Sequence, residues 1–410
     1  MKIGVWVNEP VNKNSGGSFT YLSTLTSGID NFNFNPAIEI VFISECSLLN
    51  FEKPLIHIAN HQKEISFIAK VFRRILKLIS KAIFKNLIDL IDQNEKIIKD
   101  ESAIKYLKKQ GVKIIFYPIP SSRIITGIPF ILNNWDLAHY TTYAFPEIID
   151  DGGFHKRNDW YVNILPDALM VFAETETGKK ELSNYLNLSP DKISVLPLFV
   201  SESFTNIQLP IVNQAASLKS LGLQEQEFFF YPAQFWAHKN HYNLIKAFKE
   251  FHLQHPAFKL VLCGSDKGNL TYLKKYVKEI ALEDHVIFSG FIEEDVLYTL
   301  YKNAKALIMP TFLGPSNIPP IEALHLGCPV LCSDLDGHRE ILNEAALYFN
   351  PLDHFSIFES MQLIMDESTR FQILTRQRDQ LQITHHTIGK ALIKLDKYFS
   401  EAVNIRSCWE

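Results

Sequence analysis

The residues best suited to bind an anion stand where predicted strands give way to predicted helices. The first strand runs toward Gly16 and Gly17, which directly precede a helical stretch. Paired glycines let a ligand approach the backbone closely, and a helix N-terminus favours negative charge. Lys239 stands at the start of another helix, where a cation is unfavourable unless an anion such as a diphosphate lies beside it. The alternative for Lys239 is a solvated surface side chain.

The segment 310–322, with the sequence PTFLGPSNIPPIE, combines several of these signals. Ser316 and Asn317 are residue types that cap helices, and the free amides of the turn that follows could hold phosphate oxygens. Glu322 comes one turn into the predicted helix and could bind a pair of sugar hydroxyls. The alternative for Glu322 is a first-turn acid that favours the helix dipole.

Short apolar runs alternate with helix-period segments, and this alternation predicts the scaffold. All-apolar runs suit parallel strands that are buried on both faces. The pattern occurs twice, so we expect two doubly wound α/β domains at residues 1–200 and 201–385. A tail at 386–410 is expected to be helical and to pack back on the first domain, within a stretch, 355–403, that looks helical throughout. The predicted strands are 2–7, 38–44, 112–116, 130–133, 169–173 and 193–196, then 227–232, 259–263, 286–289, 306–310, 330–333 and 346–349.

The segment 64–100 departs from this alternation. It is one long helix-period stretch with an apolar side and a basic side. A basic amphipathic helix can lie on an anionic membrane surface. The alternative is a domain helix with a solvated face. The basic stripe consists of Lys70, Arg73, Arg74, Lys77, Lys81 and Lys85.

Composition narrows the class of protein. The chain has 410 residues, with 41 Lys and Arg against 45 Asp and Glu, and a net charge of −4. This balance excludes a strongly basic nucleic-acid binder and an acidic disordered tail. The first residues lack the pattern of a secretory signal, and no window predicts a membrane-spanning helix. The five scattered cysteines and the lack of zinc-type spacing favour a reducing cytoplasm and no metal site.

Taken together, these segments resemble glycosyltransferase family 4, the retaining nucleotide-sugar transferases of the GT-B fold. In the second half the resemblance rests on YPAQFWAHKNH, GPSNIPPIEAL, GCPVLCSDLDGHRE and NEAALYFNPLD. In the first half it rests on the glycine pair, on WDLAHY and FPE between residues 135 and 147, and on LPDALMVFAETETGKKEL from residue 165. The resemblance implies two Rossmann-like domains that face a central cleft. It also implies a nucleoside-diphosphate sugar as co-substrate, with no cofactor and no metal.

The resemblance implies two catalytic residues. His139 would lie near the reacting sugar carbon in the first domain, and a structural histidine is the alternative. Lys239 would bind the diphosphate leaving group, because members of this family meet the developing charge with cationic side chains and helix dipoles.

The resemblance also implies binding residues and two departures from the family pattern. Gly16 and Gly17 would face the donor diphosphate, and Glu322 would bind the nucleotide ribose. Gly314 stands where a first glutamate usually contacts a donor-sugar hydroxyl. Gln234 stands where an arginine usually joins the diphosphate site, and His238 could replace that cation when it is protonated. Backbone amides for the phosphates or the sugar would come from Ser316, Asn317 and Ile318.

We therefore predict a retaining, mannosyltransferase-like hexosyltransferase. It would move a sugar from a nucleoside-diphosphate sugar to a glycan or lipid-linked acceptor hydroxyl in bacterial surface polysaccharide assembly. It would be cytoplasmic and peripheral at the inner face of the cell membrane. The alternatives are a non-catalytic partner of the same fold, which would bind sugar nucleotide weakly or not at all, and an epimerase- or phosphorylase-type enzyme.

Overall fold

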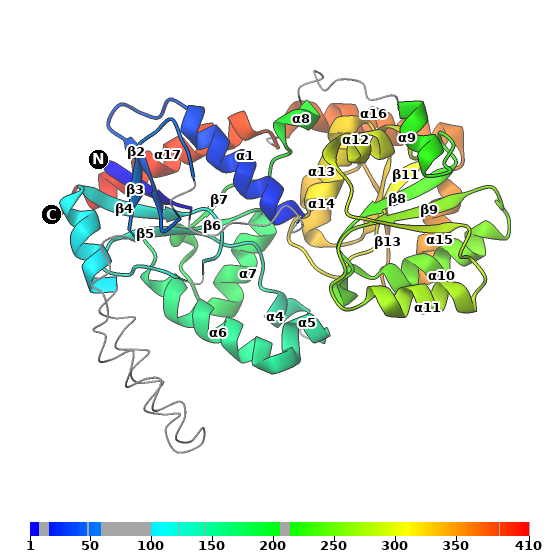
Figure 1. The fold of residues 1–410 in the computed structure, drawn as a ribbon, viewed down its shortest axis with the longest axis horizontal. Helices are drawn as coiled ribbons and strands as arrows, with labels where there is room; N and C mark the ends of the chain where they lie inside the picture. Colours follow the sequence, from blue (N-terminus) through cyan, green and yellow to red (C-terminus); the bar gives the residue numbers. More distant parts are fainter. Residues whose placement is uncertain are drawn as a thin grey trace, which may run out of the picture.

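The computed structural model describes residues 1–7, 16–46, 49–58, 100–121, 123–142, 144–205, 214–384 and 386–409. These residues form two α/β domains that lie side by side (Figure 1). The basic stripe predicted at residues 70–85, with nearly all of the helical stretch that carries it, lies outside the described residues.

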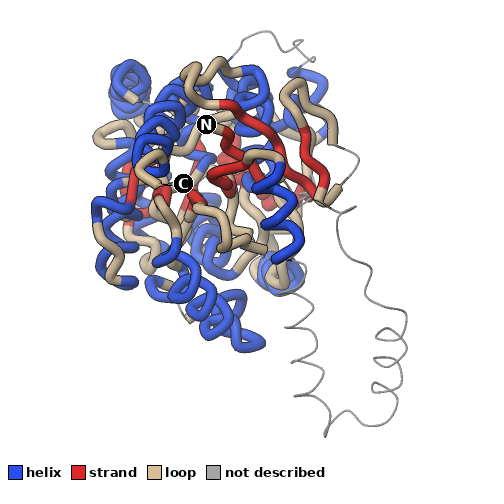
Figure 2. Tube along the Cα trace, turned by 90° about the vertical axis from the view of Figure 1, so that its left-hand side faces the viewer, coloured by secondary structure: helices blue, strands red, loops and turns tan. Residues whose placement is uncertain are grey.

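The first sheet is parallel, with the strand order β3-β2-β1-β4-β5-β6-β7. Its strands are almost wholly buried, as the apolar runs predicted, because helices lie on both sides of the sheet (Figure 2). The sequence analysis missed only β3 among the described strands, a three-residue edge strand too short to give an apolar run. The strand bounds are β1 Lys2–Trp6, β2 Glu39–Ser44, β3 Leu55–His57, β4 Val112–Tyr117, β5 Phe130–Asn133, β6 Met170–Ala173 and β7 Ile193–Val195.

The second sheet repeats the design, with the order β10-β9-β8-β11-β12-β13. In each sheet the winding reverses beside the first strand, at β1/β4 and at β8/β11. Such a switch point leaves a crevice at the carboxyl ends of the strands, where ligands bind in open α/β sheets. The strand bounds are β8 Phe228–Pro232, β9 Lys259–Cys263, β10 Val286–Gly290, β11 Ala306–Met309, β12 Val330–Ser333 and β13 Leu347–Phe349.

The helices connect the strands and place their N-termini at the crevice. In the first domain they are α1 Gly17–Asn31, α4 Ala138–Thr141, α5 Pro146–Ile149, α6 Gly153–Ile164 and α7 Glu176–Leu186. Those that follow are α8 Glu202–Thr205, α9 Gln214–Ser220, α10 His241–His252, α11 Leu270–Glu279, α12 Glu294–Asn303, α13 Ile318–Leu326, α14 Asp336–Leu342, α15 His354–Leu363, α16 Glu367–Ile383 and α17 Ile388–Arg406.

The C-terminal stretch is helical but broken, where the sequence predicted a helix throughout. Asp366 and Thr387 cap new helices with their side chains, and so divide the stretch into α15, α16 and α17. Helix α17 lies along α1 of the first domain (Figure 1). There a side chain at Gly28 would come within 2.8 Å of Ile388, and Phe399 stacks edge-on with Phe116 of β4. The residues at which the domains divide, 200 and 385, stay predictions.

Candidate active site

A cavity of about 660 Å³ opens between the two domains, at the carboxyl ends of both sheets. The loops that follow β1, β8 and β11 line it together. All the predicted site residues except His139 lie on its wall: Gly16, Gly17, Gln234, His238, Lys239, Ser316, Asn317, Ile318 and Glu322. The fold thus brings residues from three separate chain segments into one site.

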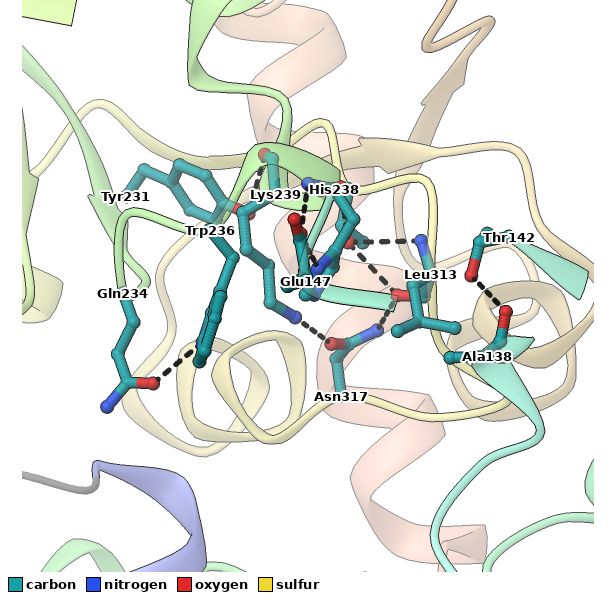
Figure 3. Close-up of polar contacts among 11 residues, drawn as sticks. Ala138, Thr142, Glu147, Tyr231, Gln234, Trp236, His238, Lys239, Leu313 and Asn317 are labelled. Carbon is teal, nitrogen blue, oxygen red and sulfur yellow. Dashed lines mark hydrogen bonds and ion pairs between the residues drawn. The ribbon is translucent and has the colours of Figure 1, made fainter. Parts of the chain in front are cut away.

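The glycine pair places the N-terminus of α1 against the second domain. Gly16 has a φ of 63°, a left-handed conformation that favours glycine. A side chain there would lie 3.6 Å from the Gln234 amide, and one at Gly17 would lie 3.3 Å from Ile318. Gln234 is held in turn, since its oxygen accepts from the Trp236 indole at 3.0 Å (Figure 3). The start of α1 therefore faces the predicted diphosphate site across the cavity.

Lys239 reaches into the cavity from the turn Ala237–Lys239 that follows β8. Its ammonium donates to the side-chain oxygen of Asn317 at 3.0 Å (Figure 3). Burial lowers the pKa of Lys239 from 10.5 to about 8, although the charge of Asp136 acts in the other direction. Within the described part of the chain no carboxylate is bonded to this ammonium. A bound anion would therefore favour its charged form.

Of the two residue types that suit a helix cap, Asn317 stands at the N-cap position of α13 and Ser316 precedes it. The side chain of Asn317, however, makes no capping bond. Its amide nitrogen instead approaches the Leu313 carbonyl and a histidine ring, while the Ser316 hydroxyl donates to the Glu174 carboxylate of the first domain. These side chains therefore leave the backbone amides of Ser316, Asn317 and Ile318 uncapped on the cavity wall, while Pro319 and Pro320 have no N–H to offer.

Gly314 has a structural reason to be glycine. Its φ is 138°, and a side chain there would overlap the Asn317 amide. The place that a glutamate side chain would need is therefore taken by Asn317, which serves Lys239 instead.

Glu322 is a buried acid in the second turn of α13. Its carboxylate accepts from the Tyr301 hydroxyl at 2.6 Å, and burial raises its pKa from 4.5 to about 7. The first turn of α13 contains no acid, so the helix-dipole alternative is wrong. Glu322 keeps its place on the cavity wall, as a binding residue requires.

His238 is bonded to the first domain, and its role as a replacement cation stays a prediction. Glu147, after Pro146 of α5, accepts from the His238 backbone amide at 2.9 Å and from its Nδ1 at 2.5 Å (Figure 3). Burial lowers the pKa of His238 in spite of this contact. Burial would raise the pKa of Glu147, but the hydrogen bonds from His238 outweigh it and lower that pKa. A neutral histidine that donates to a carboxylate fits both shifts.

His139 lies behind the wall and not on it. The ring is fully buried among Tyr140, Phe154 and Tyr161, and neither nitrogen has a hydrogen-bond partner within the described residues. Burial lowers its pKa to about 4, so the ring is neutral. Its predicted role near the reacting carbon stays a prediction.

Four charged wall residues of the first domain escaped the sequence analysis as site residues: Asp136, Glu147, Arg157 and Glu174. Asp136 accepts from Arg157 at 2.7 Å, and Glu174 meets Ser316 across the cleft. Burial raises the pKa of Glu174 to about 8. A signal was available, because Glu174 directly follows β6 and Asp136 comes soon after β5. Polar residues at the carboxyl ends of buried parallel strands mark the ligand edge.

Comparisons with known proteins agree with this geometry. Residues 213–378 match the model of the family Glycosyl transferases group 1. The O-antigen chain mannosyltransferase RfbU of Salmonella typhimurium is 27% identical over 204 residues, which cover 49% of this chain and 53% of RfbU. This chain thus spans about half the length of that curated relative.

Solved structures resemble the whole fold. Sucrose-phosphate synthase from Thermosynechococcus elongatus superposes with a TM-score of 0.72 at 15% identity, over 98% of this chain and 99% of that one. HepE of Anabaena, solved with UDP and glucose, gives a TM-score of 0.68 at 12% identity, over 98% and 100%. The chain therefore has the predicted GT-B fold, and its second domain carries the sequence pattern of glycosyl transferases group 1.

Proposed function

We propose that this protein is a retaining glycosyltransferase that moves a hexose from a nucleoside-diphosphate sugar to a hydroxyl of a glycan or glycolipid. One observation carries the proposal: Lys239, the uncapped start of α13 and the Glu322 carboxylate share one wall of the cavity. A cation and free amides suit a diphosphate, and a carboxylate suits the hydroxyl pair of a ribose. The name of RfbU favours mannose as the sugar and O-antigen as the product class.

The chemistry follows from the charges. As the bond between the sugar and the β-phosphate breaks, negative charge grows on the phosphate, where Lys239 and the backbone amides of Ser316, Asn317 and Ile318 meet it. The acceptor hydroxyl approaches from the first-domain wall, where Asp136 and Arg157 offer an acceptor and donors. A closed cleft keeps water from the donor. We propose attack from the face of the leaving group, which retains the configuration, with no metal ion required.

A donor screen tests the function. We expect one of UDP-glucose, GDP-mannose or dTDP-glucose to raise the melting temperature and to release its nucleoside diphosphate with a purified glycan acceptor. The variant Lys239→Met should fold but lose turnover at least about 100-fold, because a charge-assisted contact to the leaving group is gone. The matched control is Lys249→Met, at an exposed lysine on α10.

The outcomes separate the alternatives. A protein that neither binds nor cleaves any donor would be a non-catalytic partner of this fold. A protein that alters the donor sugar without an acceptor would be an epimerase-type enzyme. Unchanged turnover in Lys239→Met would remove Lys239 from the mechanism.

We propose further that the protein works at the inner face of the cell membrane. Within the described residues no helix is both long and apolar enough to cross a bilayer. Attachment would instead come from the basic stripe at residues 70–85, whose charges suit anionic headgroups.

A further inference from the structure

A chain of hydrogen bonds runs from Lys239 into the interior of the second domain. Beyond the Lys239 contact, the Asn317 amide nitrogen lies 3.0 Å from Nε2 of His338. Nδ1 of His338 lies 2.8 Å from the carbonyl oxygen of Ser333. His338 is 1% exposed and lies behind the cavity wall, so it reaches the cavity only through Asn317.

The chemistry of these groups fixes each donor. The Ser333 carbonyl can only accept, so Nδ1 of His338 carries the hydrogen and Nε2 is the acceptor of a neutral ring. Burial lowers the pKa of His338 to about 4, which keeps the ring neutral. Nε2 then accepts from the amide nitrogen of Asn317, and the amide oxygen is turned toward Lys239. A flipped amide would instead present its hydrogens to the ammonium, which has no acceptor.

The backbone around His338 holds this arrangement in place. Strand β12 ends at Ser333, and His338 lies in the first turn of α14, which begins three residues later. Gly337 packs so closely on the loop before α13 that a side chain there would overlap the carbonyl of Pro315. The same loop carries Asn317, so α14 and the loop that positions Asn317 are packed directly against each other.

We propose that His338 is a positioning residue that holds Lys239, through the Asn317 amide, where it meets the departing diphosphate. The proposal rests on the function proposed above, because it assumes that Lys239 acts on a diphosphate. Misplacement of a charge costs most where charge develops in the transition state. Loss of His338 should therefore lower kcat more than it raises KM.

Two substitutions isolate the contact. His338→Leu removes the acceptor for Asn317, whereas His338→Gln offers a carbonyl oxygen near the place of Nε2. Both lose the donor to Ser333, so their difference reports the Asn317 contact alone. With the donor that the wild type turns over, we expect kcat to fall about tenfold in the leucine variant and to recover to within about threefold in the glutamine variant. Should the leucine variant fail to fold, His338→Phe keeps the ring shape and takes its place.

Two readouts exclude a merely structural role. In His338→Leu the ring no longer accepts from the Asn317 amide, which can then turn its hydrogens toward Lys239 and disfavour the ammonium. The alkaline limb of the plot of kcat against pH should therefore move to lower pH. In His338→Gln this limb should stay where it is in the wild type. The other titratable groups that act on Lys239, which are Asp136, His238 and His241, are the same in every variant. In a Lys239→Met background, His338→Leu should cause no further loss of turnover.

The results distinguish two failures. If the wild type binds neither UDP nor GDP and cleaves no donor, the proposed function fails and the role of His338 fails with it. If the wild type is active and Lys239→Met is not, a leucine variant with the wild-type kcat overturns the role of His338 alone. A loss that persists in the Lys239→Met background also overturns it.

Discussion

The substitution Glu322→Gln should stabilise the free protein and weaken its affinity for nucleoside diphosphates. The two effects share one cause, since Glu322 is a buried acid on the wall of the ligand cavity. Glutamine has nearly the same shape and keeps an oxygen for the Tyr301 hydroxyl, which lies 2.6 Å from the carboxylate. The substitution therefore changes charge and acceptor number with little change in packing.

The stability term follows from the pKa of Glu322, which burial raises from 4.5 to about 7. Because the folded state holds the proton more tightly, the stabilising contribution is complete below pH 4.5 and is lost as the pH rises through 7. At about 1.4 kcal/mol per pKa unit, the ionised group costs the folded state about 3 kcal/mol at pH 8 and about 1 kcal/mol at pH 5.5. Glutamine removes this cost, so the gain in stability should be larger at pH 8.

The same substitution should weaken the affinity for nucleoside diphosphates. A carboxylate can accept from both hydroxyls of a ribose, whereas the glutamine amide offers one oxygen and no charge. Hydrogen bonds to charged groups contribute about 1.5–3 kcal/mol, so the Kd for a nucleoside diphosphate should rise about 10- to 100-fold.

Calorimetric titration with UDP and GDP at pH 8, and urea unfolding at pH 5.5 and 8, measure both terms. Glu344→Gln is the control, because Glu344 is exposed and far from the cavity wall. It should change neither quantity. An unchanged Kd in Glu322→Gln would refute the ribose assignment. A larger gain in stability at pH 5.5 than at pH 8 would refute the burial argument.

Three further predictions rest on other contacts. Because the pKa of Lys239 is about 8, binding of UDP or GDP at pH 8 should take up a proton at this residue; calorimetry in buffers of different ionisation enthalpy should show less uptake in Lys239→Met. Gly314→Ala should lower stability by about 1–3 kcal/mol, seen in urea unfolding, because the backbone there is left-handed and the Asn317 amide fills the space. The wild type should sediment with anionic but not neutral vesicles, and glutamine at four positions of the basic stripe should release it: Lys70, Arg74, Lys77 and Lys81.

The sequence predicted the scaffold well because the scaffold depends on local pattern. Buried parallel strands give continuous apolar runs, and the observed bounds of β5, β9 and β12 are the predicted ones. The apolar pattern fails to predict an element that is very short, and it fails to predict a helix end that depends on a single polar side chain. β3 has three residues, and the breaks before α16 and α17 depend on single capping side chains, Asp366 and Thr387.

The sequence located most residues of the site but not the hydrogen bonds between them. Strand-to-helix loops located Lys239 and Glu322, because the ligand edge of a parallel sheet follows from topology. Asn317 stands at the N-cap position of α13, but its side chain makes no capping bond, because this side chain and that of Ser316 each have a partner far along the chain. Glu174 is 142 residues from Ser316, and His338 is 21 residues from Asn317. Such partners depend on the closure of two domains and on loop packing, which periodicity does not report.

Burial shifts the pKa values of three residues on the cavity wall toward neutral pH, so the wall carries less charge than its residue types suggest. Burial lowers the pKa of Lys239 to about 8 and raises those of Glu174 and Glu322 to about 8 and 7. At pH 7.5 Glu174 is therefore mostly protonated, whereas Lys239 and Glu322 stay mostly charged. The bridge from Ser316 to a largely protonated Glu174 then joins the domains with little desolvation cost. A diphosphate bound as proposed would give Lys239 an anionic partner and raise its pKa, so that this residue would become fully charged. Glu174→Gln keeps an acceptor for Ser316 without a titrating group, so it should preserve the contact between the domains and leave the proton uptake at Lys239 unchanged.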